Sequence, residues 1–291
     1  LRRGRRPRTC FPRYTDDMLR LGHIEYSNCF PVHALLLDRE PPPGIEVRTA
    51  VPSVLNAELA AGRVDVSPSS SIEFARHADR YRLFPDLAIG AHGAVQSILF
   101  ETRVAPEALT GREVALPTAS ATSVVLLRIL LEKRLGVRPR YRWFDQGSVS
   151  DPFAGGADGA LFIGDVALRR RAPAGHRVYD LGEEWTAWTG LPFVFALWQT
   201  SAPAAQDAEL ARLHALLLES RAYFEANADA LAARHAERFG LDAGVLVRYW
   251  RSLRYDLDAA AIEGVLHYYA LAAELGAVPA VPALRWITLR R

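Results

Sequence analysis

Apolar runs that suit strands alternate with helix-like stretches through the first third of the chain. Strands are expected over 21–26, 47–51, 64–66, 83–89 and 94–102. Helices are expected over 31–37, 54–61 and about 70–77, with Pro31 near the first turn of one and Gly62 at the end of another. Strands that alternate with helices predict a sheet of parallel strands joined by helical crossovers.

A second alternating unit begins near Val114. Strands are expected over 114–116, 140–144, 158–163, 178–181 and 193–199. A helix is expected over 120–135, because its apolar residues fall on one stripe: Val124, Leu127, Leu131 and Leu135. The segment 145–157 is rich in Gly and Ser and lacks a helical pattern, so we assign no element to it.

From Pro203 onward the chain becomes Ala- and Leu-rich with helical spacing, and we expect this all-α segment to pack on the first lobe. The whole pattern predicts an α/β protein of two lobes, the second inserted in the first. The first lobe would comprise 18–101 and 199–291, and the second 102–198. Crossings near 100–102 and 195–199 would form a two-strand hinge, and a hinge implies a cleft that closes on a ligand.

Composition narrows the class of partner. The 291 residues are 50% hydrophobic and 23% charged, as in an ordinary globular protein, and a net charge of +2 with scattered charges favours neither nucleic acid nor a membrane surface as partner. The Arg-rich run 2–8 lacks interleaved aromatic residues, so we interpret it as a frayed terminus or sequence remnant rather than a nucleic-acid arm. With no apolar stretch of about 20 residues and no signal-peptide core, the expected location is the cytoplasm.

Several kinds of catalytic chemistry have little support. Lys133 is the only lysine, no G-x-S-x-G or phosphate-binding motif occurs, and the eight histidines are dispersed, so neither a metal nor a nucleotide cofactor is expected. Cys10 and Cys29 lack metal-ligand spacing and are expected to be free thiols. A nucleophilic Cys29 remains an alternative, although neither His23 nor His33 is a convincing base for it.

Hydroxyl and amide side chains gather where four strands end, at 24–28, 64–71, 114–123 and 161–165. Such corners combine free N–H groups with a positive helix end, which can hold a small anion without charged side chains. The segment 117–123 is the strongest case. Capping by Thr118 or Ser120 would account for one of its hydroxyls but not for four, so we predict an anion site there. The serines at 69–71 leave both interpretations open.

Two further groups of residues have alternative interpretations. Asp165 follows Gly164 at a strand end, where its carboxylate would either contact a ligand or cap the next helix through Val166. Aromatic residues around 190–192 would either line an apolar pocket or form core: Trp185, Trp188, Phe193, Phe195 and Trp198.

Taken together, these motifs resemble the chorismate dehydratases of the futalosine route to menaquinone. The resemblance runs from about Leu21 to the C-terminus and rests on 22–31 (GHIEYSNCFP), 51–52 with Leu59, 65–68 leading to 72–74, 85–89, 122–123, 161–165 and 180–196. It implies a fold similar to that of type II periplasmic binding proteins, with two lobes, mixed sheets, two hinge strands and a helical C-terminal segment.

The resemblance implies removal of water from chorismate to give 3-[(1-carboxyvinyl)oxy]benzoate, a hydro-lyase reaction without a cofactor. It also implies that Asn28 and Ser97 lie at the reacting centre. The residues expected to bind the small dicarboxylate substrate are Ser70, Ser120, Thr122, Ser123 and Asp165. Conjugation with the ring carboxylate acidifies a ring proton, so orientation, charge stabilisation and exclusion of water would suffice for catalysis.

The chain departs from the family pattern at three places that bear on pocket shape. Ser27 stands where a larger apolar residue is expected, Ser67 where a Gly is expected, and His92-Gly93-Ala94 where Asp-Gly-Pro is expected. Two other functions stay open. One is a solute-binding protein for a small carboxylate, and the other is the sibling enzyme 1,4-dihydroxy-6-naphthoate synthase, which should lack the pattern at 22–31. The oligomeric state is left open.

Overall fold

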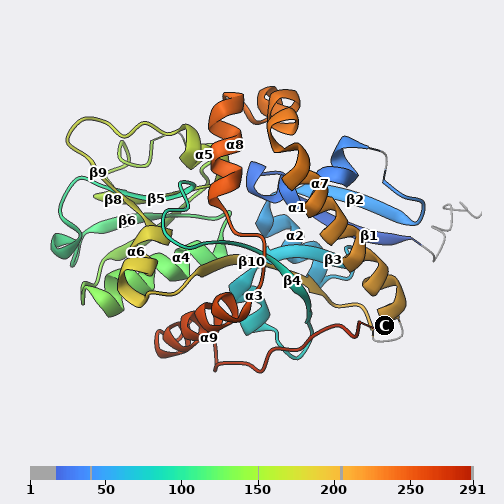
Figure 1. Ribbon diagram of the computed structural model, residues 1–291. Coiled ribbons are helices and arrows are strands. Elements are labelled where there is room, and N and C mark those ends of the chain that lie inside the picture. Colours follow the sequence, from blue (N-terminus) through green and yellow to red (C-terminus); the bar gives the residue numbers. More distant parts are fainter. Residues whose placement is uncertain (1–17, 40, 150, 204–205, 290–291) are drawn as a thin grey trace, which may run out of the picture.

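The structure, a computed structural model, describes residues 18–39, 41–149, 151–203 and 206–289. The Arg-rich run 2–8 and Cys10 therefore lie outside the described residues. The described strands form two five-stranded sheets, one in each of two lobes that lie side by side in Figure 1. This confirms the predicted α/β architecture. None of the helices in the described part of the chain combines the length and apolar character of a bilayer-spanning segment.

The first sheet has the strand order β2-β1-β3-β10-β4. Its strands are β1 (Leu19–Ile24), β2 (Ile45–Ala50), β3 (Val66–Ser70), β4 (Arg82–Ala91) and β10 (Phe193–Thr200). β1 runs parallel to β2 and β3, whereas β10 runs antiparallel to β3 and β4. The sheet is therefore mixed rather than wholly parallel, because β10 enters from the second lobe. The associated helices are α1 (Phe30–Asp38), α2 (Pro52–Ala60) and α3 (Ser71–Arg76).

The second sheet has the order β7-β6-β8-β5-β9. Its strands are β5 (Ile98–Thr102), β6 (Glu113–Pro117), β7 (Arg140–Phe144), β8 (Gly159–Ile163) and β9 (Arg177–Asp180). The helices of this lobe are α4 (Ala121–Arg128), α5 (Gly164–Arg169) and α6 (Leu181–Thr189). The helix expected over 120–135 changes from α to π geometry at η3 (Ile129–Arg134).

The crossings between the lobes lie a few residues earlier than expected. β5 pairs with β8 and β9 along its length, and β10 pairs with β3 and β4. The chain therefore crosses between β4 and β5, over 92–97, and returns between α6 and β10, over 190–192. The hinge positions at 100–102 and 195–199 were wrong because an alternating apolar pattern does not show where a chain changes its sheet. The lobe boundaries 18–101, 102–198 and 199–291 stay a proposal.

The C-terminal helices are α7 (Asp207–Phe239), α8 (Ala243–Ser252) and α9 (Ala259–Glu274). α7 packs against α1, whereas α8 stands at the junction of the lobes in Figure 1. On α9, the Tyr269 hydroxyl donates to the Ser71 carbonyl of the first lobe, and the Tyr268 hydroxyl donates to the Thr122 carbonyl of the second. The helical segment thus holds both lobes, not only the first as expected.

The tryptophan-rich segment before β10 is helix α6, for which the sequence analysis made no prediction. Asp180 caps it by accepting hydrogen bonds from the amides of Gly182 and Glu183. Trp185 and Trp198 are fully buried, and Phe193 packs edge-on against Trp185. These three aromatic side chains therefore belong to the core and do not line an apolar pocket.

Candidate active site

Asn28 lies in a 3-10 turn, η1 (Ser27–Cys29), between β1 and α1. Its side chain is partly buried, and its Oδ1 atom is buried without a hydrogen-bond partner among the described residues. The turn itself is held firmly, because the Trp250 indole Nε1 donates to the Ser27 carbonyl at 2.7 Å. A buried acceptor left without a donor costs about 1–3 kcal/mol, so Asn28 Oδ1 is suited to receive a donor from a ligand.

Ser97 is the last residue of the crossing that leads into β5, and only 1% of it is exposed. Its Oγ atom accepts a hydrogen bond from the Tyr249 hydroxyl at 2.8 Å, and its carbonyl accepts one from the Gly164 amide at 2.8 Å. The preceding Gln96 has φ of +63°, in the left-handed region, and its amide donates to Asp180. Hydrogen bonds therefore fix the Ser97 hydroxyl, the Ser97 carbonyl and the amide of the preceding residue.

Asp165 connects the lobes next to Asn28. Both of its carboxylate oxygens lie 3.1 Å from the Ser27 amide nitrogen, and the Ser27 hydroxyl also donates to Oδ1. Helix α5 has no side-chain cap, so capping, one of the two alternatives for Asp165, does not occur. Burial raises the pKa of the Asp165 carboxyl, while the hydrogen bonds from Ser27 oppose that rise.

Two pairs of consecutive residues bring Asn28 and Ser97 into one neighbourhood. Gly164 binds the Ser97 carbonyl and Asp165 binds Ser27, while Tyr249 binds Ser97 Oγ and Trp250 binds the Ser27 carbonyl. Gly164 has φ of +63°, and a Cβ atom there would lie 2.9 Å from the Tyr26 ring. This close approach requires glycine at the end of β8.

The hydroxyl-rich corner at 117–123 meets the serine corner across the junction. Thr122 Oγ1 accepts from the Ile72 amide at 3.3 Å and lies 3.4 Å from Ser71 Oγ, so the amino ends of α3 and α4 face each other. Ser120 caps α4 by accepting from the Ser123 amide, and its hydroxyl donates to Ser123 Oγ at 2.9 Å. Capping therefore accounts for two of the hydroxyls.

Ser70 is 5% exposed, and its carbonyl accepts from the Gln199 amide group. Its hydroxyl makes no hydrogen bond to another described residue. No direct hydrogen bond between described residues joins Ser70, Ser120, Thr122 or Ser123 to Asn28 or Ser97. The two groups are held by different helices: α8 binds Ser97 and Ser27, whereas α9 binds Ser71 and Thr122.

A cavity of about 510 Å³ opens between the lobes at this junction. Residues of the first lobe that line it include Tyr26 and Ser53, and residues of the second lobe include Thr118 and Asp165. Arg169 and Arg238 also line it together with three carboxylates, those of Glu25, Asp145 and Asp165, so the opening carries charges of both signs. Of the residues expected at the site, Asp165 lines this cavity, whereas Asn28, Ser97 and the hydroxyl residues Ser70, Ser120, Thr122 and Ser123 do not.

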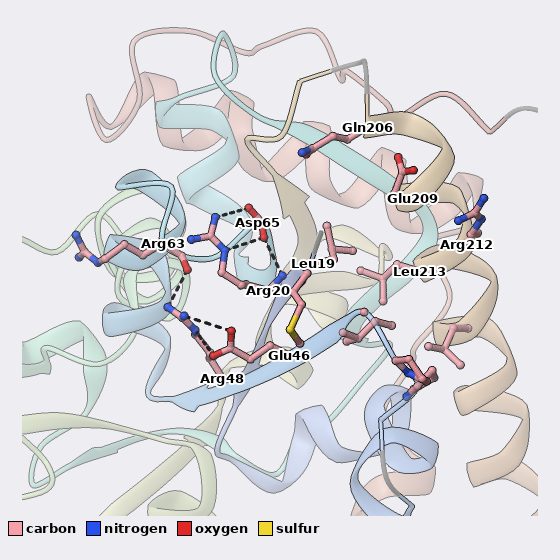
Figure 2. A pocket seen from close by; sticks show the side chains of 16 residues that line it. Leu19, Arg20, Glu46, Arg48, Arg63, Asp65, Gln206, Glu209, Arg212 and Leu213 are labelled. Atoms are coloured by element: carbon pink, nitrogen blue, oxygen red, sulfur yellow. Dashed lines mark hydrogen bonds and ion pairs between the residues drawn. The ribbon is translucent and has the colours of Figure 1, made fainter. Parts of the chain in front are cut away.

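A larger cavity of about 1130 Å³, shown in Figure 2, lies at the other end of β1. It is lined by Leu19 and Arg20 at the start of that strand, whereas Asn28 follows the strand's end. Its arginines are largely neutralised, because Arg20 pairs with Asp65 and Arg48 with Glu46. We therefore assign the candidate site to the junction of the lobes.

The fold gathers His23, Cys29 and His33, whose potential metal-ligand atoms all lie within 4.8 Å of one another. The Trp198 indole donates to His33 Nε2 at 3.2 Å, which places the His33 proton on Nδ1, 3.0 Å from His23 Nδ1. That proton occupies the position a metal ion would need. The geometry therefore fits a neutral hydrogen-bonded core cluster rather than a metal site.

The same cluster weighs against Cys29 as a nucleophile. Its Sγ atom lies 3.9 Å from His33 Nδ1, and the residue is fully buried. Burial raises the pKa of the Cys29 thiol to about 12 and lowers the pKa of His33 to about 3. The thiol therefore stays protonated, and the imidazole beside it is a weak base.

Two departures from the family pattern now have a structural account. Ser67 donates to the Pro68 carbonyl, and a Cβ atom on Gly22 would lie 2.5 Å from Ser67 Oγ, so this hydroxyl faces β1. Ser27, in contrast, supplies the hydroxyl that binds Asp165. Tyr249 and Asp180 were not predicted as site residues. One available signal was that buried tyrosine hydroxyls need hydrogen-bond partners.

Comparison with known proteins assigns the chain to a family. Residues 19–274 match a family model described as menaquinone biosynthesis. The chain is 33% identical over 255 residues to the chorismate dehydratase of Thermus thermophilus, covering 82% of this chain and 89% of that protein. It is 32% identical over 179 residues to the chorismate dehydratase of Campylobacter jejuni, covering 60% and 64% of the two chains.

The solved structures show the same fold. A protein from Archaeoglobus fulgidus superposes with a TM-score of 0.75 at 17% identity, covering 91% of this chain and all of the other. The periplasmic aliphatic sulphonate-binding protein of Escherichia coli gives a TM-score of 0.63 at 17% identity, covering 95% and 96% of the two chains. The two lobes thus have the architecture of periplasmic binding proteins.

Proposed function

Because this chain belongs to the menaquinone-biosynthesis family, we propose that it is a chorismate dehydratase, a hydro-lyase that forms 3-[(1-carboxyvinyl)oxy]benzoate. The observation that carries the proposal is the pairing of Asn28 and Ser97. Asn28 offers a buried, unpartnered amide oxygen, and Ser97 is held through the same two residue pairs that hold the Asn28 turn. A cytoplasmic location is proposed as well, in keeping with the biosynthetic role of the family.

The reaction removes a ring proton and the ring hydroxyl of chorismate and leaves an aromatic ring. The electron pair of the broken C–H bond enters the ring, the C–O bond breaks, and the hydroxyl leaves as water with the proton that the ring gave up. Ser97 Oγ, which accepts from Tyr249, donates a hydrogen bond to the leaving hydroxyl and keeps its own proton. Asn28 Oδ1 orients the substrate by accepting a hydrogen bond, and a substrate carboxylate assists removal of the ring proton.

The two substrate carboxylates are held mainly by neutral groups. Ser70, Ser120, Thr122 and Ser123 surround the facing amino ends of α3 and α4, where helix dipoles favour negative charge. Asp165 acts from the other side of the junction by fixing the Ser27 amide next to Asn28. This arrangement supports binding of a dicarboxylate without full neutralisation of the ring carboxylate, whose conjugation acidifies the ring proton.

The test is turnover of chorismate by the purified protein, followed by chromatography and mass spectrometry of the aromatic product. Asn28→Ala and Ser97→Ala are each expected to lower kcat/KM about a hundredfold or more, because both act at the reacting centre. Ser148→Ala, at an exposed serine of the second lobe, is the matched control and should behave as wild type.

Binding of chorismate without conversion would point instead to a solute-binding protein. Formation of 1,4-dihydroxy-6-naphthoate with chorismate left unchanged would point to the sibling naphthoate synthase. Full turnover by both Asn28→Ala and Ser97→Ala at unchanged KM would leave the reaction intact but remove the assignment of its residues.

A further inference from the structure

Tyr249 is a fully buried residue of α8 with a polar contact at the candidate reacting centre. Its hydroxyl lies 2.8 Å from Ser97 Oγ. Burial raises the pKa of Tyr249, so the phenol keeps its proton and serves as donor to the serine. Since a hydroxyl oxygen has two lone pairs and one proton, this bond limits where the Ser97 proton can point.

A second contact fixes α8 against the same crossing. Gln96 Nε2 donates to Ser252 Oγ at 2.9 Å, and Ser252 Oγ donates to the Tyr249 carbonyl at 2.8 Å. Gln96, which precedes Ser97, is thus connected through Ser252 to the backbone of Tyr249. The Tyr249 hydroxyl in turn binds Ser97 Oγ. The register of α8 and the position of Ser97 are therefore set together.

The crossing also contains a strained residue at this point. Gln96 has φ of +63°, a conformation that costs a non-glycine residue about 1–3 kcal/mol. The Asp180 carboxylate stabilises it by accepting from the Gln96 amide at 2.6 Å and from the Val95 amide at 2.9 Å. Backbone strain of this kind is commonly found at functional sites, and here it lies at the residue before Ser97.

We propose that Tyr249 is a positioning residue for Ser97: its hydroxyl occupies one lone pair of Ser97 Oγ and directs the Ser97 proton toward the leaving hydroxyl of the substrate. The inference rests on the proposed dehydratase function and extends it to a residue of the C-terminal helical segment. The consequence is specific to the chemical step. Loss of the phenolic hydroxyl should slow turnover without weakening substrate binding, because Tyr249 is fully buried and its hydroxyl is bound to Ser97.

The experiment compares steady-state kinetics of wild type, Tyr249→Phe, Ser97→Ala and the double variant. Tyr249→Phe is expected to lower kcat about ten- to hundredfold with KM within about twofold, as loss of one buried hydrogen bond allows. In the Ser97→Ala background the same change should have little further effect. Tyr141→Phe is the matched control, since its hydroxyl donates to Glu132 within the second lobe.

Independent, multiplicative effects of Tyr249→Phe and Ser97→Ala would overturn the inference, and so would a kcat of Tyr249→Phe within twofold of wild type. If Tyr249→Phe does not fold, 3-fluorotyrosine at position 249 replaces it, because that change keeps the side chain in place but makes the hydroxyl that binds Ser97 a stronger donor. A kcat changed several-fold at constant KM supports the inference, and an unchanged kcat overturns it. A wild-type protein that leaves chorismate unchanged overturns the proposed function together with this inference, whereas an active wild type tests the inference alone.

Discussion

Asp165 of the second lobe accepts hydrogen bonds from both the amide and the hydroxyl of Ser27 in the first lobe. The contact lies one residue from Asn28, and it is buried on both sides. This contact between the lobes therefore holds the turn that carries Asn28.

Asp165→Ala should therefore weaken both stability and catalysis. Loss of the acceptor leaves the Ser27 amide unpaired, which costs about 1–3 kcal/mol in the free energy of unfolding. Ser27→Ala keeps the amide bond and should cost less. Urea unfolding and kcat/KM measure the two effects, with Asp229→Ala at an exposed ion pair as control. Equal losses for Asp165→Ala and Asp229→Ala would contradict the role of this contact.

The free energy of unfolding should depend on pH through the titration of Asp165. Burial raises the native pKa of this carboxyl above its unfolded value of about 3.9. The folded state therefore favours the protonated carboxyl. The stabilisation that this protonated group contributes is fully present below the unfolded pKa and is lost as pH rises through the native pKa. The unfolding free energy of wild type minus that of Asp165→Asn should fall over this window. Urea titrations at several pH values measure the difference, and a rise with pH would refute the expectation.

Most of the strands could be predicted because each is a short apolar run with a turn or helix signal behind it. Helix α6 was missed although Asp180, Glu183 and Gly190 mark its two ends, because its tryptophans resemble core strand residues. The assignment of Asn28 and Ser97 to the reacting centre stays a prediction from the family resemblance. Their supporting contacts could not be predicted, since Tyr249 lies 152 positions from Ser97 and only the tertiary fold brings them together.

Two substitutions at Ser120 separate helix capping from substrate binding. Asn and Asp both cap helices well, so Ser120→Asn and Ser120→Asp should be similarly stable. Only the aspartate adds a negative charge where a substrate carboxylate is proposed to lie. The KM of Ser120→Asp for chorismate should exceed that of Ser120→Asn by about tenfold. Matching KM values would show that Ser120 serves the helix alone.

Gln96 offers a test of backbone strain. Asn tolerates the left-handed conformation, whereas a β-branched residue does not. Gln96→Val should therefore lower the free energy of unfolding by about 1–2 kcal/mol more than Gln96→Asn. Both changes shorten the side chain that reaches Ser252, so this contact is removed from the comparison. The expectation fails if the two variants unfold at the same urea concentration.

Cys29 should resist thiol reagents in the folded protein. The residue is fully buried, and burial raises its thiol pKa to about 12, so almost no thiolate forms at neutral pH. Peptide mapping after treatment with iodoacetamide should find Cys29 unmodified in native protein and modified in urea. Rapid modification under native conditions would show that the thiol is accessible and activated.

The position of β10 between β3 and β4 governs the order in which the chain can fold during synthesis. Every strand of the second sheet lies within 98–180, so that sheet can close while the first still lacks its β10. Until then, the facing edges of β3 and β4 stay open to pairing with other strands, which makes this interval the one most exposed to aggregation. The reacting centre is completed later still, when α8 has left the ribosome and Tyr249 reaches Ser97.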